Sequence, residues 1–130
     1  MSGPGDGEQL DAEHRELLVK GACPELDFLE YDVGPGYQGP GPHFHTAHVD
    51  SFYVLSGELE FRLGDNTVRA PAGTFVLVPA GTVHAFTNPG PGSARFLNVH
   101  APERGFVDYL RARNTGENVD PEQYDVWEVE

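Results

Sequence analysis

Turn-forming residues interrupt this chain so often that an all-helical fold is excluded. The 130 residues include 16 glycines and 11 prolines, and many of them stand between short runs of apolar residues. Proline breaks the hydrogen bonding of a helix interior, and both residue types serve in tight turns. The runs between them carry β-branched and aromatic residues, which are typical of strands. We therefore expect an all-β domain, and 130 residues leave little room for a second one.

Seven short runs are predicted as strands because each is bounded by turn residues. They are Leu26–Val33, Ser51–Leu55, Glu58–Leu63, Thr67–Ala70, Thr74–Val78, Val83–Thr87 and Arg95–His100. The run Thr74–Val78 is apolar throughout, so we expect both of its faces to be covered. Segment Asp11–Leu18 fits either a short helix or the approach to a first strand.

The two ends of the chain differ from this pattern. Residues 1–10 are rich in glycine and are expected to form a flexible tail, which leaves residues 11–130 as the single domain. Beyond Pro102, apolar residues at helical spacing predict a helix over Glu103–Arg113, with arginines at its C-terminal end. Segment Tyr124–Val129 fits an edge strand.

Charge and composition restrict the partners. The formal net charge is −13, from 21 acidic and 8 basic side chains. Such a surface repels phosphate backbones and anionic lipids, so we expect neither nucleic acid nor a membrane as a partner. The N-terminal segment has no basic and apolar signal pattern, and no apolar run approaches the length of a membrane span. The single cysteine, Cys23, cannot form an intramolecular disulfide, which suits a cytoplasmic location.

Histidines gather in one part of the sequence. Four of the six lie between positions 43 and 84, and His43 and His45 form an HxH pair. Residues two apart on a strand point to the same face, so both imidazoles can converge on one ion. Asp50 and His84 add an oxygen and a nitrogen donor. This donor set suits one divalent transition metal, namely Fe, Mn, Co, Ni, Cu or Zn.

The glycine and proline pattern around these ligands resembles that of the cupin superfamily. Residues 39–57, with Pro42-His43-Phe44-His45, Asp50 and Gly57, are similar to the first cupin motif. Residues 73–88, with Gly73, Pro79-Ala80-Gly81, His84 and Asn88, are similar to the second. The resemblance implies a small double-stranded β-helix (jelly-roll) barrel with a short C-terminal helix. It also implies His43, His45, Asp50 and His84 as the metal ligands.

One position departs from the family pattern, which usually has Glu where this chain has Asp50. The shorter side chain either reaches the metal directly, holds a metal-bound water, or leaves the position vacant. His48 lies inside the same loop, and it could replace Asp50, shuttle a proton, or be a solvated loop histidine. We take Asp50 and His48 as candidate catalytic residues, with the solvated loop as the simplest interpretation of His48.

A substrate pocket is predicted around the ligands. Phe52, Val54 and Phe86 share strand parity with Asp50 and His84, and they could equally be ordinary core. Tyr37 lies in the Gly/Pro-rich loop before the ligands, and Asn98 and His100 share parity on a later strand. Apolar walls would suit a small organic substrate, for example an aromatic one.

The resemblance extends to function. Single-domain cupins include dioxygenases, isomerases, lyases and polyketide cyclases, and the stretch Phe96–Pro102 is similar to bacterial quercetinase-like members. We therefore expect a metal-dependent, dioxygenase-like oxidoreductase. A non-oxidative cupin and a non-catalytic metal- or ligand-binding cupin are the alternatives. Small cupins commonly form homodimers, for which Leu59, Phe61 and Leu63, or Trp127 and Val129, could supply an apolar patch; the alternative is ordinary core.

Overall fold

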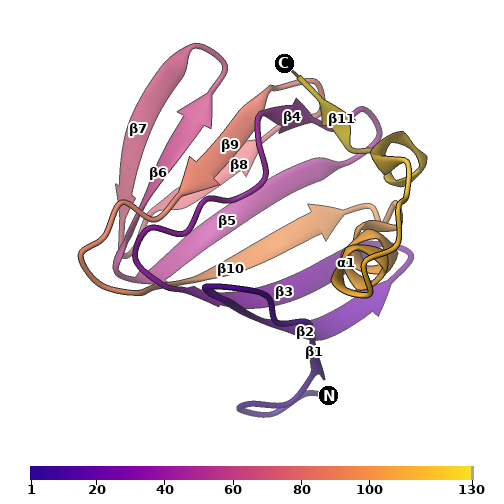
Figure 1. Cartoon of the computed structure of the whole chain (residues 1–130), viewed down its shortest axis with the longest axis horizontal. Helices are drawn as coiled ribbons and strands as arrows, with labels where there is room; N and C mark the ends of the chain where they lie inside the picture. The colour runs from indigo at the N-terminus through magenta and orange to yellow at the C-terminus, as the bar shows by residue number, and fades with distance from the viewer. Residues whose placement is uncertain (130) are drawn as a thin grey trace.

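The computed structural model describes residues 1–129 and consists of two antiparallel β-sheets with one short α-helix (Figure 1). One sheet has the strand order β1-β2-β3-β10-β5-β8, and the other has the order β11-β4-β9-β6-β7. The strands are β1 (Glu8–Gln9), β2 (Arg15–Cys23), β3 (Leu26–Val33), β4 (His43–Phe44), β5 (Val49–Ser56), β6 (Glu58–Leu63), β7 (Asn66–Pro71), β8 (Phe75–Val78), β9 (His84–Thr87), β10 (Ala94–Ala101) and β11 (Trp127–Glu128). The predicted all-β jelly-roll class is confirmed.

The strands follow the turn residues closely. Strands β3 and β6 have the predicted bounds. Each of the other five predicted strands differs from its predicted bounds by one to three residues, counted over both ends. Gly57, between β5 and β6, shows why a turn residue is required there. It has a φ of 74°, and a Cβ atom at this position would lie 2.4 Å from the carbonyl oxygen of Ser93. Only glycine fits that conformation and that close approach.

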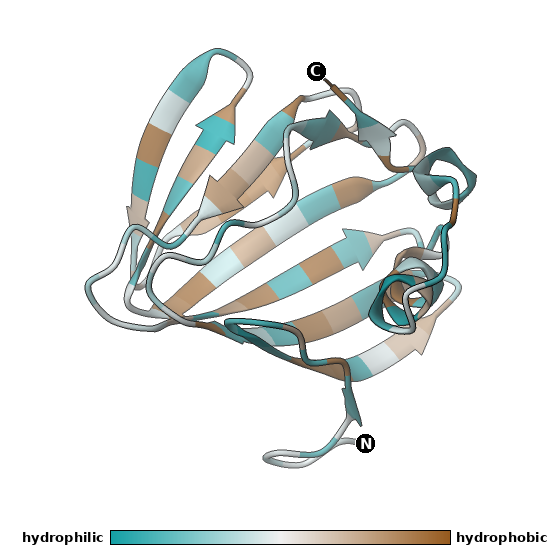
Figure 2. Cartoon of the chain, in the orientation of Figure 1, coloured by the Kyte–Doolittle hydropathy of each residue, from teal (hydrophilic) through white to brown (hydrophobic). Residues whose placement is uncertain are grey.

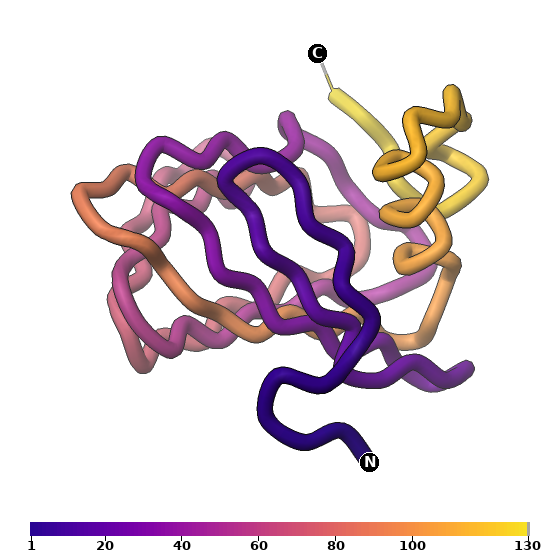
Figure 3. Tube along the Cα trace, turned by 60° about the horizontal axis from the view of Figure 1, so that its bottom comes forward, coloured from indigo at the N-terminus to yellow at the C-terminus, as the bar shows by residue number. Residues whose placement is uncertain are grey.

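The undecided N-terminal segment forms a strand. β2 begins at Arg15 and pairs with β3, while Ala12 and Arg15 form a turn-like bridge before it. Within the segment expected to be a tail, β1 pairs with β2 and Leu10 is buried. The flexibility of residues 1–10 therefore stays a prediction, and their last residues lie against the domain (Figure 3).

The core lies between the two sheets. Phe52 of β5 and Phe96 of β10 contact Phe86 of β9, with ring centroids 5.4 Å apart in each pair. Buried residues alternate with more exposed ones along these strands, which places one face of each strand on the core. Apolar and polar residues both occur along the strands of the two sheets (Figure 2). Leu59 and Phe61 are completely buried in this core, which makes them core residues rather than a docking surface.

The expectation that both faces of Thr74–Val78 are covered is wrong. Phe75 and Leu77 of β8 are 60% and 54% exposed, whereas Val76 and Val78 are buried. β8 stands at the end of its sheet and has one face on the core.

The C-terminal part lies at one end of the sandwich (Figures 1 and 3). Helix α1 (Phe106–Asn114) begins three residues later than predicted and is followed by the 3₁₀-helix η1 (Pro121–Tyr124). The expected edge strand is shorter than Tyr124–Val129, because only β11 pairs, with β4. Neither of these helices is long and apolar enough to cross a membrane.

Candidate metal centre

Strand register brings the predicted ligands together. His43 of β4 stands directly opposite His84 of β9, and Asp50 of β5 stands opposite His100 of β10. His45 follows β4, and its carbonyl oxygen accepts a hydrogen bond of 2.6 Å from the backbone N–H of Gly81. Gly81 adopts a φ of 88°, so the turn before β9 holds the loop that carries His45.

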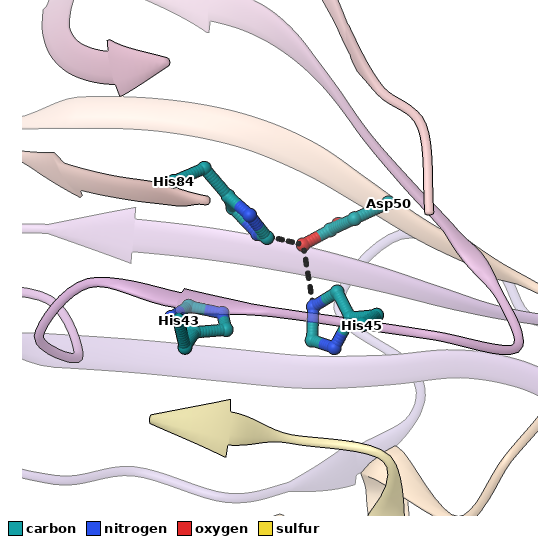
Figure 4. Close-up of side chains that lie close together, drawn as sticks. All are labelled: His43, His45, Asp50 and His84. Carbon is teal, nitrogen blue, oxygen red and sulfur yellow. Dashed lines mark hydrogen bonds and ion pairs between the residues drawn. The ribbon is translucent and has the colours of Figure 1, made fainter. Parts of the chain in front are cut away.

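The four side chains point toward one another in the interior (Figure 4). Nε2 of His84 lies 3.0 Å from Asp50 Oδ2, and Nε2 of His45 lies 3.4 Å from the same oxygen. With His43, these residues place one ligand atom each within 4.8 Å of the others, and all four are at most 5% exposed. Atoms bound to one ion at about 2.1 Å lie at most about 4.2 Å apart, so the cluster is close to a ligating arrangement.

Backbone carbonyls fix which ring nitrogen of each histidine is free. The Nδ1–H of His43 donates to Gly41 O (2.9 Å), that of His84 donates to Thr82 O (2.9 Å), and that of His45 donates to Asp125 O (2.7 Å). In a neutral imidazole the other nitrogen then carries a lone pair. Three lone pairs therefore face one space, and the buried Nε2 of His45 has no hydrogen-bond partner among the described residues. This donor set fits a divalent cation.

The electrostatics of the cluster agree with that fit. Burial, and then the neighbouring His84, lower the pKa of His43 to about 4, so this ring is neutral at pH 7. Burial alone would raise the pKa of Asp50, but the neighbouring rings of His100, His45 and His84 hold it well below its usual value. Burial also opposes a charge on His45, yet Asp50 and Asp125 raise the pKa of this ring. Protons and a metal ion compete for His45 Nε2 as a result.

A second row of polar groups runs from the C-terminal segment to Asp50. His48 Nδ1–H donates to Asp125 Oδ2 (2.8 Å), and His48 Nε2 lies 2.9 Å from His100 Nδ1. His100 Nε2 lies 2.9 Å from Asn98 Oδ1, and the amide of Asn98 donates to Asp50 Oδ1 (2.6 Å). His48 is only 2% exposed, so its interpretation as a solvated loop residue is wrong.

Asp125 organises the ligand loop and is a functional residue that no sequence pattern indicated. Its carboxylate accepts hydrogen bonds from the backbone N–H groups of Thr46 and Ala47, at 2.8 and 2.7 Å. It also accepts from the Thr46 hydroxyl, from His48 and from the indole of Trp127. Burial would raise its pKa, but the hydrogen bonds from Thr46, Ala47 and Trp127 keep the pKa of Asp125 far below its usual value. In the sequence it is a single Asp near the C-terminal end, about 80 residues from the ligand loop, and no pattern around it indicates a contact with that loop.

A cavity of about 330 Å³ opens onto the cluster. Of the predicted pocket residues, Tyr37, Phe52, Phe86, Asn98 and His100 line it, together with His43, Asp50 and His84. Val54 is completely buried in the core. The sequence analysis did not foresee the contribution of α1, whose Phe106 stacks on His100 with ring centroids 3.9 Å apart.

Two sheets that enclose a His/His/Asp/His cluster define a cupin-type double-stranded β-helix. The cupin domain family model (Cupin_2) matches residues 29–100, more than half of the chain, and the chain belongs to this family. The matched part contains the four predicted ligands, His48, Asn98 and His100, whereas Asp125 and α1 lie outside it.

Several known proteins are similar to this chain. An oxidoreductase, OpS7, from Beauveria bassiana is 36% identical over 56 residues, which are 42% of this chain and 18% of that protein. Quercetin 2,3-dioxygenase from Bacillus subtilis is 29% identical over 89 residues, 65% of this chain and 26% of the enzyme. The chain thus spans about a quarter or less of these relatives. Among solved structures, KdgF from Halomonas sp. matches with a TM-score of 0.69 and 22% identity, over 77% of this chain and 92% of that one.

Proposed function

We propose that this chain is a metal-dependent enzyme that acts on a small organic substrate, with one divalent transition metal bound by His43, His45, Asp50 and His84. One observation carries the proposal. Three buried imidazoles direct their Nε2 atoms at one space while their Nδ1–H groups are engaged by carbonyl oxygens. This is the arrangement that metal-bound histidines adopt in proteins, since it fixes both tautomer and ring orientation.

We further propose oxidoreductase chemistry of the dioxygenase type. Partial similarity to a quercetin dioxygenase and to an oxidoreductase supports this reaction class. A transition metal with open positions supplies Lewis acidity and, for a redox-active ion, electron transfer. Asn98 orients the carboxylate of Asp50, the nearest base to the cavity. The walls formed by Phe52, Phe86 and Phe106 limit the access of water.

His48 and His100 are assigned a proton-relay role in this proposal. Burial, with the neighbouring His45, lowers the pKa of His48, and burial lowers that of His100 to about 3, so both rings are neutral. Three links join Asp125, the two rings and Asn98. Each link needs one N–H group as its donor, but two neutral rings carry only two. One of the three links therefore has no proton, and the two rings together can accept one. His100 Nε2 lies 3.4 Å from Asp50 Oδ1, so the two rings lead from Asp50 to Asp125, which is 8% exposed at the far end.

A first experiment is elemental analysis of the untagged protein, purified without added metal. We expect about one transition metal ion per chain in the wild type and a loss of at least 90% in His84→Ala. His14→Ala is the matched control, because His14 is exposed and lies outside the cluster. Absence of metal after reconstitution with each of the six ions would contradict the proposal.

Activity and binding assays of the metal-loaded protein separate the reaction classes. Oxygen uptake with candidate substrates supports the dioxygenase. Metal-dependent turnover without oxygen supports the non-oxidative alternative, an isomerase, lyase or cyclase. Tight ligand binding with no turnover would leave the non-catalytic binding protein.

A further inference from the structure

The charge of the cavity differs from that of the rest of the chain. The net charge is −13, yet Arg15 and Arg113 both line the cavity above the His/Asp cluster. Neither guanidinium forms an ion pair with a carboxylate in residues 1–129, whereas Arg69, Arg95 and Arg111 each do. Arg62 and Arg104 also lack a carboxylate partner among residues 1–129, but only Arg15 and Arg113 combine this lack with a place in the lining of the cavity.

The two arginines come from different elements that meet on one side of the cavity. Arg15 lies at the start of β2, and its Nη2 donates to the carbonyl of Leu10 and to Oδ1 of Asn114, each at 3.0 Å. Asn114 ends α1 and directly follows Arg113. Arg113 donates to the hydroxyl of Tyr109 (2.9 Å), and its guanidinium lies 5.6 Å from the centre of that ring. Neutral acceptors therefore hold both side chains and leave their charge uncompensated.

The anionic groups of the cavity do not pair with either arginine. Asp50 lies among the histidines, and its close contacts are with His45, His84 and His100. Glu13 also lines the cavity, but it is exposed, and its Oε1 lies 3.4 Å from Nε2 of His14. The two arginines therefore give this side of the cavity a positive charge that no carboxylate of residues 1–129 pairs with, inside a strongly acidic protein. A positive cleft in such a surface concentrates and orients anions.

The remaining walls are aromatic. Tyr37 and Phe86 are tilted neighbours with ring centroids 6.1 Å apart, and Phe106 stacks on His100. Burial raises the pKa of the Tyr37 hydroxyl, which stays a neutral donor. About 330 Å³ lies near the lower end of the range for small-molecule sites.

We infer that the ligand of this cavity is an organic anion: an apolar, ring-sized body between the aromatic walls, with a carboxylate that Arg15 and Arg113 recognise at the mouth. Recognition at the mouth leaves the other end of the molecule toward the metal ligands. The inference names the substrate class of the proposed function and rests on it for the chemistry, but the binding of the anion rests on the arginines alone.

Calorimetric titration with cinnamate and with cinnamamide tests this, because the two differ in charge and hardly in shape. In the wild type we expect cinnamate to bind at least tenfold more tightly than the amide. Arg15→Gln and Arg113→Gln are each expected to reduce that ratio at least threefold, and the double variant to bring it close to one. Arg62→Gln is the matched control, since Arg62 is exposed and donates to Gly64 O outside the cavity. Each titration is run with metal-loaded and with chelator-treated protein.

The outcomes separate the two proposals. Equal affinity for both compounds, no binding of either, or a preference that survives the double variant would overturn the inference. A preference that vanishes on metal removal would also overturn it, since the ion would then be the anion site. A preference that persists in a protein that holds no metal would support the inference while the proposed function fails.

Discussion

Replacement of Asp125 by Asn is the sharpest test of how the ligand loop is held. The substitution keeps the size of the side chain, and Asn tolerates the left-handed backbone found here, where φ is 56°. Oδ1 of Asp125 accepts from the amide and hydroxyl of Thr46 and from Trp127. The amide oxygen of Asn would take the place of Oδ1 and keep these three bonds. Its NH₂ group would take the place of Oδ2 and face two donors, the backbone N–H of Ala47 and the ring Nδ1–H of His48.

The expected cost follows from these contacts. His48 can respond by moving its proton to Nε2, but the backbone N–H of Ala47 cannot. A donor left without an acceptor at this part-buried position costs about 1 kcal/mol, the low end of the range for buried groups. The three retained bonds lose the carboxylate charge, which makes such bonds roughly twice as strong. We expect a loss of about 2–4 kcal/mol in the free energy of unfolding. For a chain of this length that is a fall of about 10 °C in Tm.

Thermal and urea unfolding of chelator-treated protein at pH 7 and pH 3 would measure this loss. Because the folded pKa of Asp125 lies below the unfolded value of about 3.9, its contribution is present above that value and lost as pH falls further. The difference between wild type and Asp125→Asn should therefore shrink at pH 3. Asp65→Asn, in an exposed turn, is the matched control. A Tm change below about 2 °C at pH 7, or a difference independent of pH, would refute the argument.

Two further predictions concern other parts of the molecule. Asp27 is fully buried and its carboxylate has no hydrogen-bond partner within residues 1–129, and burial, with Glu103 and Asp108, raises its pKa to about 6. Its charge thus costs stability as pH rises from the unfolded pKa of about 3.9, and the cost is complete above pH 6. Asp27→Asn should therefore add about 1–2 kcal/mol at pH 8 and almost nothing at pH 4, measured by urea unfolding. The expected homodimer stays a prediction. We expect Phe75→Ser with Leu77→Ser, on exposed positions of β8, to reduce the mass in light scattering from two chains to one, and an unchanged mass would exclude this face.

The sequence predicted those features that depend on neighbours along the chain. Turn residues marked the strand ends because glycine and proline restrict the backbone locally, as at Gly57. The spacing of His43 and His45 predicted a shared face because side chains alternate between the two faces of an extended chain, which is also a local property. The burial of His48 was not predictable in this way. Its partners, Asp125 and His100, lie 77 and 52 positions away, and no local pattern indicates such a contact.

The same contrast divides the candidate site into two parts. The family-matched region, residues 29–100, supplies all four predicted metal ligands and the row from His48 to Asn98. The segments outside it supply Arg15, Phe106 and Arg113 to the cavity and Asp125 to the ligand loop. The flanks therefore contribute both arginines and Phe106 to the cavity, while the family core contributes the candidate metal ligands. A relative that shares only the core is accordingly expected to share the proposed metal site but not the substrate. Substitutions in the flanks should change which molecule binds before they change whether a metal does.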